Sequence, residues 1–320
     1  MRHTALAACV LMSCSLGAAA QVLAYVSSEK DHAISIIDAT TLTVTGTIPT
    51  CKRPRHMQLS GGGSQLLVAC GDSKQADVID LATRKSVGTV PLGDDPEIFD
   101  LSPDGKTLYV SNEEDAEVGI VDMATKKRVG AIKVGQEPEG VKVSPDGKWV
   151  FVTSEVASLV HAIDTESRKV VKNIAVGKRP RRFAFNADGS ELWVSNELGA
   201  SVSVISVQTL AVTHTVKLEV KGLRTKDITP VDLKLSKDGK TMYVSLGQAN
   251  HVAFVDSTTK KVGPLALAGK RAWGLGVSPD GKQLWVANGL SDDVTVVDTS
   301  AGKPLRTIKA GRVPHSIVIR

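Results

Sequence analysis

The chain has 320 residues, of which 42% are hydrophobic and 23% are charged, and its formal net charge at pH 7 is +5. The charges alternate along the chain instead of forming a basic block, so nucleic-acid binding is not indicated. Beyond the N-terminal segment, no apolar run approaches the ~20 residues of a membrane-spanning helix.

Residues 1–20 are typical of a secretory signal peptide. Charged Arg2 precedes a short apolar stretch that ends in small residues, which is the order found in such signals. We expect cleavage after Ala20, so the mature chain, residues 21–320, is predicted to be periplasmic or secreted. The alternative is a lipoprotein that is processed and anchored at Cys14.

The rest of the chain repeats with a period of 42 residues, stretched to 50 at one step. An aromatic residue or a leucine marks each unit, at Tyr25, Leu67, Tyr109, Phe151, Trp193, Tyr243 and Trp285. Thirteen residues further on, six of the seven units have an aspartate, and the fifth has Ser206. A period of 40 to 45 residues is the signature of a β-propeller. The sequence therefore predicts an all-β, seven-bladed propeller that fills residues 21–320 as one domain.

The fourth unit shows how each blade is expected to be built. Val141–Val143 alternates in polarity and leads to the hairpin signal Asp146–Gly147. The next run, Trp149–Val152, is apolar throughout, as expected of a strand that is covered on both faces. Residues 159–164 and 170–174 complete four antiparallel strands, which we name A to D.

The ends of the chain are predicted to share a blade. Seven B strands are present, but only six A strands lie between them, and the seventh is His315–Ile319 at the C-terminus. This strand should pair with the N-terminal B strand near Val22–Val26. Such pairing closes the ring and leaves no free sheet edge.

Two cysteines follow the predicted signal segment, Cys51 and Cys70. Cys51 leads into strand A of the second blade and Cys70 ends strand B, and these strands run antiparallel. Export to an oxidising compartment favours disulfides. We therefore predict a disulfide between these two residues.

The candidate binding residues lie where the repeat is most variable, in the connections from strand D to strand A. These connections should open on one face, around the central channel. The predicted set follows the proline that closes most units and consists of Arg55, His56, Glu97, Glu139, Arg181, Arg182, Asp232, Trp273 and His315. Glu97 and Glu139 would face Arg181 and Arg182 in a polar funnel, with Trp273 as an aromatic anchor unless something covers it. The alternative is a solvated rim whose charges pair with one another.

Other signals for chemistry are weak. An insertion around residues 221–229 is expected on the same face and is either functional or a tolerated loop. The chain has no haem c motif, no His-Glu-x-x-His and no phosphate-binding glycine loop, so we predict no cofactor and no metal. Scattered loop histidines rarely form a metal site, although four are expected on the funnel side, at His32, His56, His251 and His315.

The blocks Ser102–Gly105 and Tyr109–Asn112 resemble the YVTN-type propeller repeats of exported bacterial proteins. The order of the connectors is similar to that of the β-propeller proteins associated with pyrroloquinoline-quinone-dependent catabolism, through Arg53–Arg55, Asp95–Glu97, Glu137–Gly140, Arg179–Arg181 and Arg271–Trp273. The resemblance covers the whole mature chain. It implies an accessory role in periplasmic alcohol oxidation, beside a quinoprotein dehydrogenase, a c-type cytochrome or a transport component.

The sequence thus favours a monomeric, non-enzymatic binding module that presents its funnel to a partner of a quinoprotein system. The alternative is a propeller-type hydrolase, such as a lactonase, that uses carboxylates at the channel mouth. Glu97, Glu139, Asp232 and His315 are the residues available for that chemistry.

Overall fold

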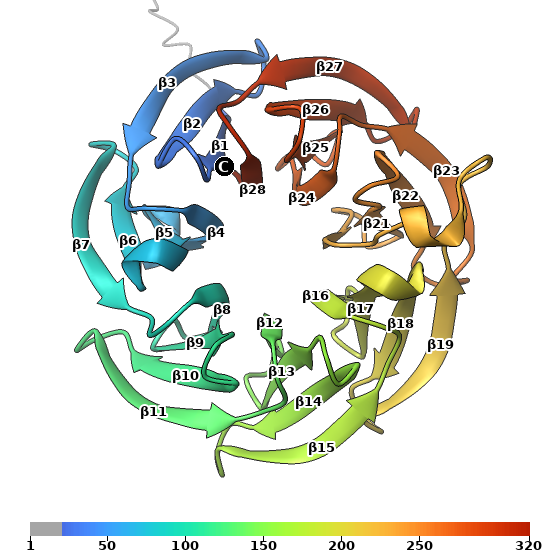
Figure 1. Ribbon diagram of the computed structural model, residues 1–320. Helices are drawn as coiled ribbons and strands as arrows, with labels where there is room; N and C mark the ends of the chain where they lie inside the picture. Colours follow the sequence, from blue (N-terminus) through green and yellow to red (C-terminus); the bar gives the residue numbers. More distant parts are fainter. Residues whose placement is uncertain (1–20) are drawn as a thin grey trace, which may run out of the picture.

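The computed structural model describes residues 21–320 as a ring of seven four-stranded antiparallel sheets arranged around a central axis (Figure 1). This confirms the predicted seven-bladed propeller. The predicted signal segment, residues 1–20, lies outside the described residues. Among residues 21–320, no helix has the length and apolar character that a membrane crossing requires.

Each blade runs from strand A at the channel to strand D at the perimeter. The strands of the first four blades, in that order, are β28 (Pro314–Ile319), β1 (Leu23–Ser28), β2 (Ala33–Asp38) and β3 (Thr43–Pro49); β4 (Pro54–Ser60), β5 (Gln65–Cys70), β6 (Gln75–Asp80) and β7 (Lys85–Pro91); β8 (Pro96–Leu101), β9 (Thr107–Asn112), β10 (Glu117–Asp122) and β11 (Lys127–Lys133); and β12 (Pro138–Val143), β13 (Trp149–Ser154), β14 (Leu159–Asp164) and β15 (Lys169–Ala175).

The other three blades have the same order. Their strands are β16 (Pro180–Phe185), β17 (Glu191–Asn196), β18 (Ser201–Ser206) and β19 (Ala211–Lys217); β20 (Leu233–Leu235), β21 (Thr241–Ser245), β22 (His251–Asp256) and β23 (Val262–Leu267); and β24 (Ala272–Val277), β25 (Gln283–Asn288), β26 (Asp293–Asp298) and β27 (Lys303–Lys309). Within residues 21–320, single 3₁₀ turns lie in loops at η1 (Gly61–Gly63), η2 (Gly71–Ser73), η3 (Glu197–Gly199) and η4 (Thr225–Asp227).

Burial explains the polarity pattern of the strands. Five of the six residues of β13 are buried, because neighbouring blades cover both faces of a B strand. The outermost strand β15 is largely exposed, and Ile174 is its one fully buried residue. Apolar clusters fill the spaces between blades: Phe151 of the fourth blade packs against Phe183 and Leu192 of the fifth. The core is therefore a ring of interfaces between blades.

The aspartate that recurs in the repeat caps the turn between strands C and D. Asp122 Oδ1 accepts hydrogen bonds from the backbone N–H and the hydroxyl of Thr125, both at 2.7 Å. In the fifth blade, Ser206 Oγ accepts the equivalent bond from the backbone N–H of Thr209 at 3.3 Å. A short polar side chain that bonds the backbone two or three residues on stabilises such a turn. The repeated aspartates are therefore structural.

The closing blade is built from both ends of the chain, as predicted. Strand β28 pairs antiparallel with β1, with Tyr25 opposite Val318 and Val26 opposite Ile317. The backbone N–H of Leu23 also donates to the carbonyl oxygen of Arg320 at 2.7 Å. In the second blade, a disulfide joins Cys51 and Cys70, with Cα atoms 5.8 Å apart.

The insertion between β19 and β20 is anchored in the core. Val220 and Ile228 are 8% and 3% exposed and pack with Leu246 and Ala249 of the sixth blade. Residues 221–226 between them are exposed. The insertion therefore extends the apolar interface between the fifth and sixth blades.

Candidate functional site

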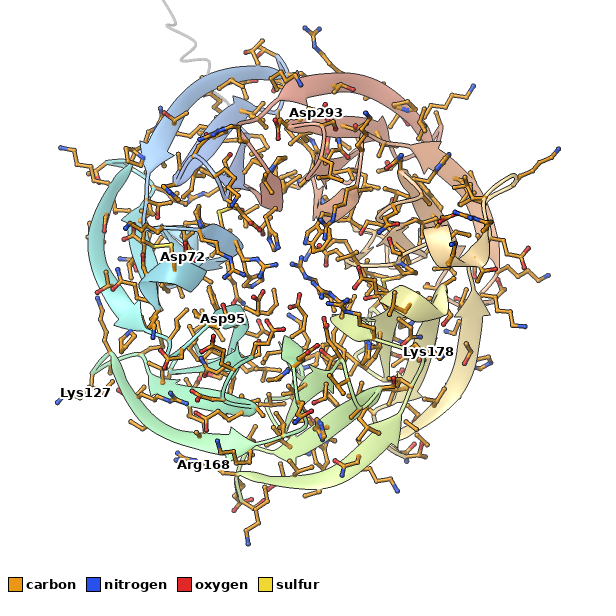
Figure 2. All side chains as sticks on the ribbon, in the orientation of Figure 1. Asp72, Asp95, Lys127, Arg168, Lys178 and Asp293 are labelled. Atoms are coloured by element: carbon orange, nitrogen blue, oxygen red, sulfur yellow. A yellow bond between two sulfur atoms is a disulfide. The ribbon has the colours of Figure 1, made fainter. Side chains whose placement is uncertain are left out.

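Two kinds of loop meet on one face of the ring, which we call the funnel face. In each blade, the turn between strands B and C lies beside the connection that enters strand A. The backbone N–H of Glu155 donates to the carbonyl of Glu137 at 3.0 Å, and that of Glu197 donates to the carbonyl of Arg179 at 2.8 Å. Figure 2 shows Asp95 towards the centre of the ring, whereas Arg168 lies at its perimeter.

Arg181, the first polar residue of β16, is the centre of a buried charge cluster. Its guanidinium contacts Glu139 at 3.0 Å, Glu197 at 3.7 Å and Glu155 at shorter range. Arg179 joins the cluster from the exposed side, with its Nε 2.6 Å from Glu155 and 3.3 Å from Glu197. The side chains of Arg181, Glu139 and Glu155 are 7%, 5% and 2% exposed. These charges pair with one another, as expected in the alternative of a self-paired rim, but the paired side chains are buried and not solvated.

His315 Nε2 is the acceptor for three donors from other blades. Trp273 Nε1 donates at 3.0 Å, and Arg55 and Arg182 each donate at 3.3 Å. Arg271 lies 4.2 Å from the centre of the Trp273 ring, which is only 7% exposed. The prediction that Trp273 is a free aromatic anchor is therefore wrong, because His315 and Arg271 of the same protein cover its ring.

Glu97 does not share a partner with Glu139, contrary to the expectation that both face Arg181 and Arg182. It pairs with two arginines of the preceding blade, with Arg53 at 3.2 Å and with Arg55 at shorter range. Arg53 also contacts Asp95 at 3.1 Å. The repeat explains this pairing. Residues at the same repeat position in adjacent blades lie side by side, and Arg55 and Glu97 share such a position in the second and third blades.

Burial shifts the pKa values of several of these groups. Burial raises the pKa of Glu155 to about 7, against the opposing effect of Arg181. Burial, followed by repulsion from Glu139, also raises the pKa of Glu97. Burial and then the charge of Arg55 hold the pKa of His315 well below its usual range. Glu155 can therefore exchange a proton near neutral pH, whereas His315 stays neutral.

His56, Arg182 and Asp232 occupy the second repeat position and lie deeper than predicted. They line a central cavity of about 460 Å³ beneath the charge cluster. Asp232 is also a structural bridge, since it accepts the backbone N–H of Leu275 in the next blade at 2.9 Å. These three residues are therefore not part of the mouth.

The predicted set of binding residues left out the glutamates of the B–C turns and the arginines that precede strand A. The glutamates are Glu29, Glu113, Glu155 and Glu197, and the arginines are Arg53, Arg179 and Arg271. The glutamates share one position of the repeat and the arginines share another, and other units have different residues at both positions. The criterion of variability between units, which selected the predicted residues, could therefore also have selected these two sets. Antiparallel pairing of strands A and B places both sets on the funnel face.

One group of carboxylates comes close enough to share a cation within residues 21–320. Its members are Asp95, Glu97 and Glu113, with ligand atoms within 4.8 Å of one another. Arg53 already contacts two of them, so the protein supplies a compensating positive charge. The four histidines expected on this side do not join the group.

Two hollows flank the charge cluster on the funnel face. One, of about 390 Å³, lies between the fourth and fifth blades and is lined by Glu155, Lys178 and Arg179 among others. The other, of about 270 Å³, includes Trp273 and His315 in its lining. Both place charged side chains beside open space, where a polar ligand could reach them.

Comparison with known proteins identifies the family. The sequence model described as "Lactonase, 7-bladed beta-propeller" matches residues 160–320, just over half of the chain. The chain belongs to this lactonase family. The model of the cytochrome D1 heme domain matches a shorter part, residues 97–182. No curated protein matches the chain.

Solved structures with the same fold include members named as lactonases. The periplasmic gluconolactonase of Pseudomonas aeruginosa is 20% identical and covers 93% of this chain and 98% of its own, with a TM-score of 0.79. A Bacteroides fragilis protein assigned as a 6-phosphogluconolactonase is 18% identical and covers 94% and 98%, with a TM-score of 0.78. Hydrazine synthase of Kuenenia stuttgartiensis is 23% identical and covers 86% and 92%, with a TM-score of 0.76. At these identities, the likeness shows the fold alone.

The lactonase family corrects the functional interpretation of the sequence. The prediction of a non-enzymatic binding module is wrong, because the family match favours the alternative, a propeller-type hydrolase. The comparisons support the seven-bladed propeller but not the specific resemblance to proteins of quinone-dependent catabolism. The sequence contains none of the haem c, His-Glu-x-x-His or phosphate-loop motifs, and their absence favoured a binding module over an enzyme.

Proposed function

We propose that the protein is a lactone hydrolase with its active site on the funnel face, between the fourth and fifth blades. The observation that carries the proposal is Glu155, a buried carboxylate whose pKa is raised to about 7 and which contacts both Arg181 and Arg179. A general base is most effective when its pKa lies near the working pH.

The hollow beside Glu155 provides room for the substrate. Its volume of about 390 Å³ lies within the ~300–1,000 Å³ range of small-molecule sites. Arg179 is 42% exposed and lines the hollow, so its guanidinium can reach a ligand there. Lys178, labelled in Figure 2, lines the same hollow. These charged side chains suit a small lactone that carries hydroxyl groups, and we propose a sugar lactone as the substrate class.

The chemistry follows from these positions. The Glu155 carboxylate accepts a proton from water as the water oxygen attacks the lactone carbonyl carbon. Arg179 donates hydrogen bonds to the carbonyl oxygen, which becomes negatively charged in the tetrahedral intermediate. When the ring C–O bond breaks, protonated Glu155 returns its proton to the departing alkoxide, and the product is a hydroxy acid. Arg181 holds Glu155 in place and compensates its charge.

The test is the hydrolysis of lactones by the purified protein. Proton release from δ-gluconolactone, γ-gluconolactone and a 6-phosphorylated δ-lactone should exceed spontaneous hydrolysis for at least one of them. Glu155→Gln should lower kcat by roughly 10²–10⁴-fold, the usual contribution of general base catalysis. Glu166→Gln is the matched control, because Glu166 is exposed on the opposite face. A folded protein that accelerates none of these reactions would contradict the proposal.

We also propose that the enzyme is exported and acts after a sugar oxidation. A cyclic hemiacetal becomes a lactone when it loses two electrons and two protons, so an enzyme that oxidises the sugar must supply the substrate. The signal-like residues 1–20 and the resemblance to quinone-associated propellers support a periplasmic quinoprotein dehydrogenase as that source. Cell fractionation and the N-terminal sequence of the mature protein test the location. A mature chain that starts at Gln21 in the periplasmic fraction is expected, and full-length protein in the cytoplasm would contradict it.

A further inference from the structure

The central cavity beneath the charge cluster is separate from the proposed active site. The buried mouth residues, among them Arg181 and His315, lie above it and are absent from its wall, which is built from the A strands of all seven blades. The wall extends to Leu59, Val277 and Ile319, near or at the ends of their strands. The cavity therefore reaches towards the face that carries the A–B turns, opposite the funnel.

The two carboxylates of the cavity wall already have partners. Asp100 accepts hydrogen bonds from a backbone N–H and a glutamine of neighbouring blades, at 2.9 and 2.8 Å, and pairs with Lys142 at 2.9 Å. Asp232 accepts two backbone N–H groups, both at 2.9 Å. Their negative charge is thus partly used in holding the blades together.

Two cations of the wall are less well satisfied. The Arg182 side chain is 7% exposed and, among residues 21–320, makes one hydrogen bond, from a terminal nitrogen to His315 Nε2 at 3.3 Å. A guanidinium has five N–H donors, and Arg182 Nε has no partner. Its nearest carboxylate atoms, on Asp232 and Glu139, are 3.8 and 3.9 Å away. Within residues 21–320, no carboxylate lies within 4.0 Å of the Lys234 ammonium, which is therefore the cation of the wall that lacks an ion-pair partner.

Buried donors without acceptors are costly, and an excess of positive charge attracts an anion. We propose that the central cavity binds a small carboxylate anion, held by Lys234 and Arg182. The planar guanidinium matches a carboxylate in shape, and the unpaired Lys234 ammonium supplies a positive charge for a monoanion. The volume of about 460 Å³ accommodates a ligand the size of a sugar acid. His56 lies in the same wall, and burial followed by the charge of Arg182 holds its pKa well below the usual range, so it adds no positive charge.

This inference does not depend on lactonase activity, and its test measures binding alone. Isothermal titration of the purified full chain with D-gluconate at low ionic strength should show saturable binding. Lys234→Met removes the free cation but keeps much of the side-chain volume, and it should weaken binding by about tenfold or more, as expected for the loss of a charged hydrogen bond. Lys240→Met is the matched control, an exposed lysine in the A–B turn of the same blade, and should bind as the unsubstituted protein does.

Three further measurements test whether gluconate binds in this cavity and not at the proposed active site, and whether the cavity prefers a carboxylate. Arg179→Met alters the proposed active site, and it should leave gluconate affinity in the cavity unchanged. Lys234→Met should leave lactone hydrolysis unchanged, so this inference and the proposed function can fail independently. Inorganic phosphate should bind more weakly than gluconate. The inference is overturned if gluconate does not bind, if affinity depends on Arg179 and not on Lys234, or if only phosphate binds.

Discussion

Glu155 and Arg181 belong to neighbouring blades and meet in an ion pair whose side chains are 2% and 7% exposed. Arg181 also contacts Glu139 at 3.0 Å, so one guanidinium compensates two buried carboxylates. Such a pair gives little net stability by itself, but the loss of one partner leaves an uncompensated buried charge. The same contacts that hold the proposed base in place therefore also join the fourth and fifth blades.

Replacing Arg181 should destabilise the protein. Arg181→Met leaves Glu139 without its closest cation and Glu155 with Arg179 alone, and we expect a loss of roughly 3–5 kcal/mol in the free energy of unfolding. Urea denaturation measures this change. Arg168→Met is the control, because Arg168 is exposed at the perimeter of the ring (Figure 2), and it should change stability by less than about 0.5 kcal/mol. Similar small losses in both variants would show that the charge cluster contributes little to the fold.

The fold was predictable because it depends on features that repeat. The hairpin signal at Asp146–Gly147, the apolar B strand and the capping aspartates each recur at fixed spacing, and together they determine strand order and the closing pair. The missing A strand, found at His315–Ile319, predicted the contact between the chain ends. The disulfide position follows from the same antiparallel register, because Cys70 lies opposite Pro54.

The site was only partly predictable, since side-chain partners depend on which blades are adjacent and on depth. The sequence located Arg181 and Glu139 at the mouth but paired Glu97 with the wrong arginines. It placed Trp273 as an exposed anchor, because nothing in a linear pattern shows that His315 and Arg271 cover it. Glu155 escaped notice because its position resembled a turn, and its raised pKa arises from burial, which appears only once the blades are packed.

The rate of lactone hydrolysis should depend on the ionisation of Glu155. Its pKa is raised to about 7, chiefly by burial, and a general base works only as the carboxylate. We therefore expect kcat/KM to rise about tenfold per pH unit below 7 and to level off above it. The measurement is a pH profile corrected for spontaneous hydrolysis. The residual activity of Glu155→Gln should lack this rise, and an unchanged profile in that variant would exclude Glu155 as the titrating base.

Reduction of the disulfide should weaken the second blade. Cys51 and Cys70 are 19 residues apart, and closing a loop of that size stabilises a protein by roughly 3 kcal/mol in the chain-entropy model. The double variant Cys51→Ser and Cys70→Ser should lose about that amount in urea denaturation. Adding dithiothreitol should destabilise the unsubstituted protein and leave the variant unaffected. Two reactive thiols in the non-reduced native protein would contradict the disulfide.

Strand β28 should be decisive for closure of the ring, because it joins the chain ends. Ile317 is 5% exposed and packs in the cluster that includes Val26 and Trp285. Ile317→Ala should cost about 2–5 kcal/mol in the free energy of unfolding, as is usual when a buried isoleucine is truncated. Leu305→Ala is the control, because Leu305 lies on the outermost strand of the neighbouring blade and is 54% exposed. It should change stability by less than about 0.5 kcal/mol. If the two substitutions have equal small effects, the packing of β28 contributes little to the stability of the ring, and closure must depend on its backbone hydrogen bonds to β1.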